Sequence, residues 1–116
     1  MSQNLYISQI TVIELAERLA QPNNKLQLID VRELHEVMIA NIDGFRVLSL
    51  SEFELWSDKI TTDLNPNMET FVICHHGIRS AQMCHWLLNN GFTNVKNIIG
   101  GIDAYALHVD PTIPRY

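Results

Sequence analysis

The sequence is poor in cysteine and in long apolar runs, and each shortage excludes a class of protein. Only two of its 116 residues are cysteines, Cys74 and Cys84, which we expect to be free thiols and not a structural disulfide. No apolar run approaches the length of a membrane-spanning helix. Residues 1–20 also lack the basic, apolar and small-residue regions of a secretory signal. We therefore expect a cytoplasmic protein with no membrane partner, and a domain without targeting signals favours a bacterial host.

Positive charge is scarce as well. Eight lysines and arginines stand against thirteen aspartates and glutamates, which gives a net charge of −5. Because phosphate binding requires a basic surface, we expect no nucleic-acid partner. The composition is 47% hydrophobic, which is enough for a core at this length. Since repeats, low-complexity segments and linkers are absent, we expect one domain over residues 1–116.

The hydrophobic pattern alternates between strand-like and helix-like segments. Thr11 and Glu14 have the spacing of a capping box, and apolar residues then recur at helical spacing through Leu19. We expect further helices at residues 33–39, 51–59, 80–90 and 102–107, and strands at residues 26–31, 45–50, 70–74 and 95–99; residues 5–7 form another short apolar stretch. This alternation predicts an α/β fold whose mostly parallel sheet is covered by helices on both faces, in three layers.

Three residues mark the expected ends of these helices. Ser51 and Ser80 have side chains suited to the N-cap, so we place each as the first residue of its helix. Gly91 follows the helix at residues 80–90 and can adopt the left-handed conformation that ends a helix.

The segment "FVICHHGIRS", residues 71–80, carries the chemistry. In open α/β sheets ligands bind beyond the carboxyl ends of the strands, and Cys74 stands at such an end with a helix close behind it. The N–H groups of a tight loop and of a helix N-terminus together form an anion-binding concavity. Gly77 lets the chain bend there. We therefore expect Cys74 to be a nucleophile that is held as a thiolate.

The size of each electrostatic effect shows which groups the thiolate needs. Ionising most of a free thiol at neutral pH requires a shift of about two pKa units, or roughly 2.7 kcal/mol. A helix N-terminus supplies about 0.3–1 kcal/mol. Convergent amide hydrogen bonds and the positive charge of Arg79 must supply the remainder.

Three stretches of the chain resemble motifs of the rhodanese-type sulfurtransferases. "CHHGIRS", residues 74–80, looks like the family's Cys-x-x-Gly-x-Arg-Ser loop. "LIDVRELHE", residues 28–36, looks like its Asp-Val-Arg motif with the following Glu. "IIGGIDAY", residues 98–105, is similar to its Gly-Gly-x-x-Ala-aromatic motif, with Tyr105 where Trp is common. Together the three motifs cover most of the chain in the family's order.

The resemblance implies a five-stranded, largely parallel sheet and a ping-pong sulfur transfer without a cofactor. Cys74 would take the outer sulfur of a donor such as thiosulfate as a persulfide and pass it to cyanide or to a thiol. The ring of N–H groups would bind the donor's oxyanions first and the terminal persulfide sulfur afterwards.

The residues that the resemblance assigns to the substrate surround the nucleophile. They are His75, His76, Gly77, Ile78, Arg79 and Ser80. Ser80 is an N-cap first and a site residue second, and the histidines either line the mouth or are simply exposed. We expect no metal site, because adjacent histidine side chains diverge and no second ligand pair is present.

Outside the loop, simpler interpretations compete with site roles. Asp30 and Arg32 could support the site, but we favour a structural ion pair. Cys84 falls at helical spacing among apolar residues and is expected in the core. The segment after the Asp-Val-Arg motif departs from the family, since "ANIDGF", residues 40–45, replaces its usual Gly-His-Ile and Gly-Ala. We expect this departure to change local packing more than chemistry.

Loop length separates sulfur transfer from its neighbours. Four residues lie between Cys74 and Arg79, whereas phosphatases and arsenate reductases of the same fold use five, which widens the loop for a tetrahedral oxyanion. We therefore favour sulfur transfer over phosphate or arsenate chemistry. Two further classes stay open: a binding module without turnover, and a persulfide carrier that a protein donor supplies.

Overall fold

The centre of the molecule is a five-stranded parallel sheet, in a computed structural model that describes residues 6–22 and 24–116. The strands are β1 (Gln9–Ile10), β2 (Gln27–Asp30), β3 (Arg46–Val47), β4 (Thr70–Ile73) and β5 (Val95–Ile98). Their order is β1-β5-β4-β2-β3, and every neighbouring pair is parallel. All five strands therefore end at one edge of the sheet, and this edge is where α/β folds bind their ligands.

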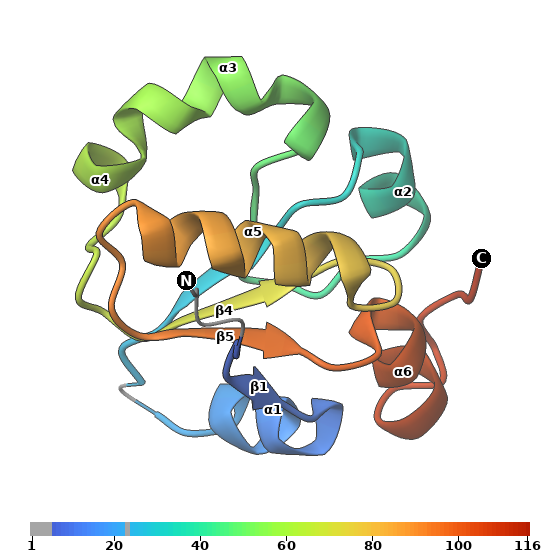
Figure 1. Cartoon of the computed structure of the whole chain (residues 1–116). Coiled ribbons are helices and arrows are strands. Elements are labelled where there is room, and N and C mark those ends of the chain that lie inside the picture. Colours follow the sequence, from blue (N-terminus) through green and yellow to red (C-terminus); the bar gives the residue numbers. More distant parts are fainter. Residues whose placement is uncertain (1–5, 23) are drawn as a thin grey trace.

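Helices cover both faces of the sheet (Figure 1). One face carries α1 (Val12–Leu19) and α6 (Gly101–His108). The other carries α5 (Ile78–Asn89) and a run of short helices, namely η1 (Leu50–Glu52), α3 (Phe53–Trp56), η2 (Ser57–Lys59) and α4 (Ile60–Asp63). The remaining helix, α2 (Leu34–Ile39), follows β2. The predicted three-layer α/β fold with a parallel sheet is confirmed.

Each face of the sheet buries its own apolar cluster. Leu15 of α1 and Ile102 of α6 pack against Phe71 of β4 on one face. Cys84 of α5 belongs to the cluster on the other face and is fully buried, as the sequence predicted. Burial raises the pKa of the Cys84 thiol to about 12, with a smaller contribution from Cys74, so this thiol stays protonated and unreactive at neutral pH.

Two of the predicted helix ends are present. At the start of α1, the Glu14 N–H donates to Thr11 Oγ1 at 3.1 Å and the Thr11 N–H donates to Glu14 Oε1 at 2.9 Å, which is the expected capping box. After α5, Gly91 has φ +95° and the Phe92 N–H donates to the Leu87 carbonyl at 3.0 Å. The Asn90 N–H donates to the same carbonyl at 3.0 Å, so both bonds close the last turn of the helix.

The segment between β2 and β4 differs from the prediction. The strand expected at residues 45–50 shortens to Arg46–Val47, and short helical turns run from Leu50 to Asp63 in place of one helix. Ser51 is not an N-cap, because its hydroxyl bonds the Glu33 carboxylate instead. Toward the N-terminus, the first strand begins at Gln9, after the apolar stretch expected at residues 5–7, of which residue 5 lies outside the described residues.

The buried Ser49 explains the early end of β3. Its hydroxyl donates to the Arg32 carbonyl at 2.7 Å, while the indole N–H of Trp56 donates to the Ser49 carbonyl at 2.9 Å. These bonds turn the chain away from the sheet and begin the helical turns at once.

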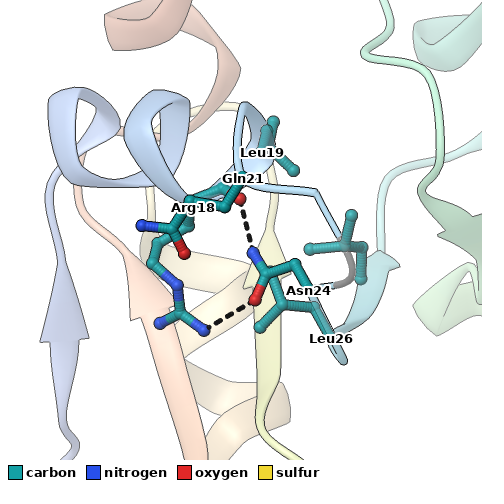
Figure 2. A pocket seen from close by; sticks show the side chains of 6 residues that line it. Arg18, Leu19, Gln21, Asn24 and Leu26 are labelled. Carbon is teal, nitrogen blue, oxygen red and sulfur yellow. Dashed lines mark hydrogen bonds between the residues drawn. The ribbon is translucent and has the colours of Figure 1, made fainter.

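The amino edge of the sheet is tied by ion pairs. The two Arg18 nitrogens donate to the Glu69 carboxylate at 2.6 and 3.0 Å, and Lys96 Nζ lies 2.7 Å from the same group. Arg18 also donates to Asn24 Oδ1 at 3.2 Å beside a small pocket that includes Leu26 (Figure 2). Because Glu69 directly precedes β4 and Cys74 follows it, this pocket lies at the opposite end of the strand from the cysteine.

Candidate active site

Cys74 directly follows β4 and is almost completely buried, with 1% of its surface exposed. The Gly77 backbone N–H donates to Cys74 Sγ at 3.0 Å, and Ser80 Oγ lies 3.2 Å from the same sulfur. The sulfur therefore accepts one backbone hydrogen bond and lies next to a hydroxyl group. It also lies at the N-terminus of a twelve-residue helix. The Gly77 N–H and the helix N-terminus each favour negative charge on sulfur.

Gly77 is the N-cap of α5 and turns the chain into the helix. Its φ of +103° lies in the left-handed region, and a Cβ atom at this position would come within 3.1 Å of the Gly100 backbone nitrogen. The predicted helix start at Ser80 is therefore wrong, since the bend at Gly77 allows the helix to begin at Ile78. Ser80 lies inside the first turn with its side chain fully buried, where it contacts the sulfur instead of capping the helix.

Asn97 of the neighbouring strand β5 holds the loop in place, and no sequence motif assigned it a role. Its side chain is buried, its Nδ2 donates to the Gly77 carbonyl at 3.1 Å, and its Oδ1 accepts from the Ser80 hydroxyl at 2.5 Å. One amide thus fixes both groups that contact the sulfur of Cys74. The available signal was a polar residue between Val95 and Ile99, on the apolar face of a strand whose other face carries Lys96.

The N-terminus of α6 holds the other side of the loop. The Ile102 N–H donates to the Cys74 carbonyl at 2.9 Å, and the Asp103 N–H donates to the His75 carbonyl at 3.1 Å. This approach needs glycine at position 101, because a Cβ atom on Gly101 would lie 2.4 Å from both carbonyl oxygens. The close contact gives a physical reason for the second glycine of the third motif.

A pocket of about 280 Å³ opens beside the sulfur. Its lining residues are Cys74, His75, His76, Ile78 and Arg79. Four of the six predicted substrate-binding residues therefore face this pocket together with the cysteine. The other two, Gly77 and Ser80, contact the sulfur itself.

Arg79 is paired across the site with Glu36 of α2. Its two terminal nitrogens donate to the two Glu36 oxygens at 2.7 and 2.9 Å. The bonds from Arg79 hold the pKa of the Glu36 carboxyl at about 2, against partial burial, and the same pair raises the pKa of Arg79. Glu36 belongs to the second motif, but its partner lies 43 positions away, so the sequence alone did not connect them.

The two histidines stack instead of diverging. Their ring centroids lie 3.9 Å apart at 30°, so the expectation that adjacent side chains point apart is wrong here. The Tyr116 ring stacks on the other side of His75 at 3.8 Å and 5°. Burial, followed by the neighbouring His76, lowers the pKa of His75. The His75 ring is therefore neutral at neutral pH, and the pocket wall that it forms is uncharged.

Asp30 and Arg32 form a buried ion pair behind the site. Arg32 Nη2 lies 2.7 Å from Asp30 Oδ2, and neither residue lines the pocket. The guanidinium also donates to the carbonyls of Glu36 at 3.2 Å and Ala40 at 2.7 Å. The pair therefore fixes α2 and the start of the segment at residues 40–45, where the sequence departs from the family, which agrees with the favoured structural role.

These features can be compared with known proteins. The profile of the rhodanese-like domain matches residues 11–108. The chain belongs to the rhodanese-like domain family. Among curated relatives, this rhodanese-like domain is 46% identical over 118 residues to the Rhodanese-like/PpiC domain-containing protein 12, chloroplastic, of Arabidopsis thaliana, covering 100% of the chain and 40% of the relative.

A second relative carries a sulfurtransferase name. The domain is 30% identical over 121 residues to the Adenylyltransferase and sulfurtransferase MOCS3 of the same plant, covering 94% of the chain and 26% of that protein. The chain thus spans well under half the length of both relatives. A solved rhodanese-like domain protein from Staphylococcus aureus superposes with a TM-score of 0.74 at 24% identity, covering 95% and 99% of the two chains, which shows the shared fold.

The chemistry that this rhodanese-like domain can support follows from its geometry. A thiol at the end of a strand accepts a backbone hydrogen bond that stabilises its anion, beside a pocket large enough for a small molecule. Family membership supports sulfurtransferase-type activity in general terms. Among the described residues, no group of three or more histidine, cysteine, aspartate or glutamate side chains is placed to hold a metal ion.

Proposed function

We propose that this rhodanese-like domain transfers a sulfane sulfur through a persulfide on Cys74. The thiolate attacks the outer sulfur of thiosulfate, the sulfur–sulfur bond of the donor breaks, and sulfite leaves with the electron pair. The terminal sulfur of the persulfide then passes to cyanide or to a thiol acceptor, which regenerates the thiolate. The observation that carries the proposal is the hydrogen bond of 3.0 Å from the Gly77 N–H to the sulfur of Cys74, which lies beside the open pocket.

The residues around the pocket have different roles in the proposed reaction. The Gly77 N–H stabilises negative charge on the cysteine sulfur and then on the persulfide, while Ser80, whose hydroxyl donates to Asn97, lies beside the sulfur. Arg79 attracts the anionic donor, and the stacked His75 and His76 with Ile78 form the walls that enclose the transferred sulfur. Asp30 and Arg32 act at a distance by fixing α2, on which Glu36 holds Arg79.

The first experiment is the intact mass of the protein after incubation with thiosulfate. A gain equal to one sulfur atom is expected for the wild type and for Cys84→Ser, and no gain for Cys74→Ser. Thiosulfate:cyanide transfer should follow the same pattern. A Cys74→Ser protein that still transfers sulfur would end the proposal.

A second candidate is a persulfide carrier that receives its sulfur from a protein donor. The charge of the pocket favours this carrier, because the guanidinium of Arg79 is already paired with both carboxylate oxygens of Glu36 and because His75 is neutral. Little positive charge is left uncompensated for the dianion thiosulfate. The test compares persulfide formation on Cys74 from thiosulfate with that from a persulfidated donor protein such as a cysteine desulfurase. A protein donor that acts at far lower concentration would favour the carrier.

Oxyanion chemistry is the least favoured alternative. The loop has four residues between Cys74 and Arg79, and the single N–H that bonds the sulfur leaves a small anion site. We expect no turnover of an activated aryl phosphate and no reduction of arsenate. Turnover of either at a rate comparable with sulfur transfer would reverse the assignment.

The setting of the reaction is also proposed. We assign it to one domain over residues 1–116, in a bacterial cytoplasm, without nucleic acid or membrane partners. The Arabidopsis relative is named chloroplastic, so fractionation of the source cells is the measurement that decides the compartment. None of the helices in residues 6–22 and 24–116 has the length and apolar character needed to cross a bilayer.

A further inference from the structure

The segment after α6 returns to the active-site loop. In Figure 1 it leaves α6 and runs along the side of the molecule on which α2 lies. Two consecutive residues fasten it. The Arg115 guanidinium donates to the Asp103 carboxylate at 2.9 and 3.1 Å, and the Asp103 N–H in turn holds the His75 carbonyl. The Tyr116 ring lies flat on the His75 ring, with 3.8 Å between centroids.

The hydroxyl of Tyr116 bridges the two ion pairs of the site. It accepts from Arg32 Nη1 at 2.9 Å and donates to Glu36 Oε1 at 3.0 Å. The same Glu36 oxygen accepts from Arg79 Nη2 at 2.9 Å. One side chain therefore joins the buried Asp30–Arg32 pair to the guanidinium that lines the pocket. Burial raises the pKa of Tyr116, so the hydroxyl keeps the proton that it donates to Glu36.

Arg79 is held in place through Glu36, so the groups that fix the Glu36 carboxylate also fix the guanidinium. About a third of its side chain, 34%, is exposed, whereas the side chain of Glu36 is 11% exposed. A partly exposed arginine pays conformational entropy to stay in one place, so the position of its guanidinium depends on how firmly the carboxylate is fixed. The described contacts of that carboxylate come from Arg79, from Tyr116 and from the Glu33 N–H at 3.0 Å.

We propose that Tyr116 is a positioning residue for the sulfur-transfer site, which fixes Glu36 and through it the Arg79 guanidinium beside Cys74, while its ring holds His75 against the pocket. The proposal rests on the proposed function, since it assigns Arg79 to an anionic donor. Tyr116 itself does not line the pocket and does not touch the cysteine sulfur.

The test separates the hydroxyl from the ring. Tyr116→Phe removes the bridge and keeps the stack, whereas Tyr116→Ala removes both. Thr112→Ala is the matched control, because Thr112 lies in the same segment and its hydroxyl bonds only Asp110 among the described residues. We expect Tyr116→Phe to raise the KM for thiosulfate by about fivefold, the factor for one lost hydrogen bond, with kcat changed by less than about twofold. Thr112→Ala should match the wild type.

A chemical measurement tests the same geometry without sulfur transfer. Iodoacetate is an anion and iodoacetamide is neutral, and both alkylate a thiolate, so the ratio of their rates at Cys74 reports the charge that Arg79 presents. The ratio should fall by about fivefold in Tyr116→Phe and fall further in Arg79→Ala. Thermal unfolding of each variant shows whether the fold has been lost.

The outcomes are distinct. An unchanged alkylation ratio and an unchanged KM in Tyr116→Phe overturn the proposal, as does an unchanged ratio in Arg79→Ala. If the ratio falls in the tyrosine variant while the wild type transfers no sulfur, the positioning role stands and the proposed function fails. If Tyr116→Ala unfolds, Tyr116→Phe still decides, because it keeps the ring in place.

Discussion

At the scale of single residues, the loop around the cysteine depends on buried polar groups that pair with one another. Asn97 is the central case, since its amide serves both the Gly77 carbonyl and the Ser80 hydroxyl. A buried group that loses its partner pays its full desolvation cost, whereas an exposed group pays little. The two groups beside the cysteine sulfur therefore depend on an amide in β5 that never touches the sulfur.

Asn97→Ala should show this dependence. The Gly77 carbonyl and the Ser80 hydroxyl both lose a partner, so we expect a loss of about 1–3 kcal/mol in the free energy of unfolding. Sulfur transfer should fall by more than tenfold as the loop loosens. Urea denaturation and kcat/KM are the measurements. Asn94→Ala, at an exposed position directly before the same strand, is the control that should leave both unchanged.

Arg79 gives a second prediction at this scale. Arg79→Lys keeps the charge but loses the two-pronged bond to Glu36, whereas Arg79→Ala loses both. We expect the KM for thiosulfate to rise modestly in the lysine variant and by about tenfold or more in the alanine variant, since charged hydrogen bonds are worth about 1.5–3 kcal/mol. Equal KM values in all three proteins would show that Arg79 does not meet the donor.

At the scale of elements, the loop between β4 and α5 is held by its neighbours. β5 reaches it through Asn97, and α6 reaches it through the N–H groups of Ile102 and Asp103. α2 holds the first turn of α5 beside it through Glu36. The tightest of these approaches is at Gly101, where the helix backbone lies against the carbonyls of the loop. A change in α6 should therefore reach the cysteine directly.

The comparison of Gly101→Ala with Gly91→Ala isolates this contact. Both glycines have positive φ, +62° and +95°, so both variants pay the same kind of backbone strain, of about 1–2 kcal/mol. Only at position 101 would the new methyl group meet backbone atoms, at 2.4 Å, whereas nothing lies within 4 Å at position 91. We expect Gly101→Ala to lose far more stability and nearly all activity.

The measurements are thermal unfolding and sulfur-transfer rate on both proteins. Gly91→Ala should remain active with a slightly lower Tm. An active, stable Gly101→Ala protein would show that α6 can move away from the loop without cost, and that the contact does not shape the site.

The helices and strands also show which parts of the fold the sequence could predict. The alternation of strands and helices and the cysteine at a strand end are local patterns. The sequence could therefore predict the parallel sheet and the place of Cys74 at the end of a strand. The helix start at Ser80 was wrong because the bend at Gly77 is a backbone property that the loop adopts under contact with Gly100. Single-domain organisation and the roles of the site residues stay predictions.

At the scale of the whole molecule, two carboxylates make stability depend on pH. Bonds from Arg79 and Arg18 hold the pKa values of Glu36 and Glu69 at about 2, against an ordinary value of 4.5. A carboxyl whose pKa is lowered by folding stabilises the protein above its unfolded pKa, and that stabilisation is lost as the pH falls through the folded value.

We therefore expect the free energy of unfolding to fall between pH 4.5 and about 2. After allowance for screening at partly exposed groups, each carboxylate should contribute roughly 1–3 kcal/mol. Urea denaturation at several pH values measures the fall, and it should be shallower in Glu69→Gln, which is already less stable at neutral pH. A wild type equally stable across this range would contradict both ion pairs.

The site residues whose contacts the sequence did not predict all bond partners that are distant in the chain. Glu36, Asn97 and Tyr116 come from a helix, a strand and an irregular segment, and their partners lie 43, 20 and 84 positions away in the chain. Sequence patterns report neighbours within a turn or a strand. Partners at such distances are brought together only by the packing of the complete fold.

The order of the sheet has a consequence for synthesis. β1, which begins at Gln9, pairs with β5, whose residue Asn97 lies opposite it. A nascent chain therefore has to keep its first strand unpaired until nearly the whole sequence has left the ribosome. Contacts this far apart slow folding and expose strand edges meanwhile. The Cys74 thiol is buried only in the finished fold, so a newly made chain exposes it to oxidants that convert a thiol to a sulfenic acid.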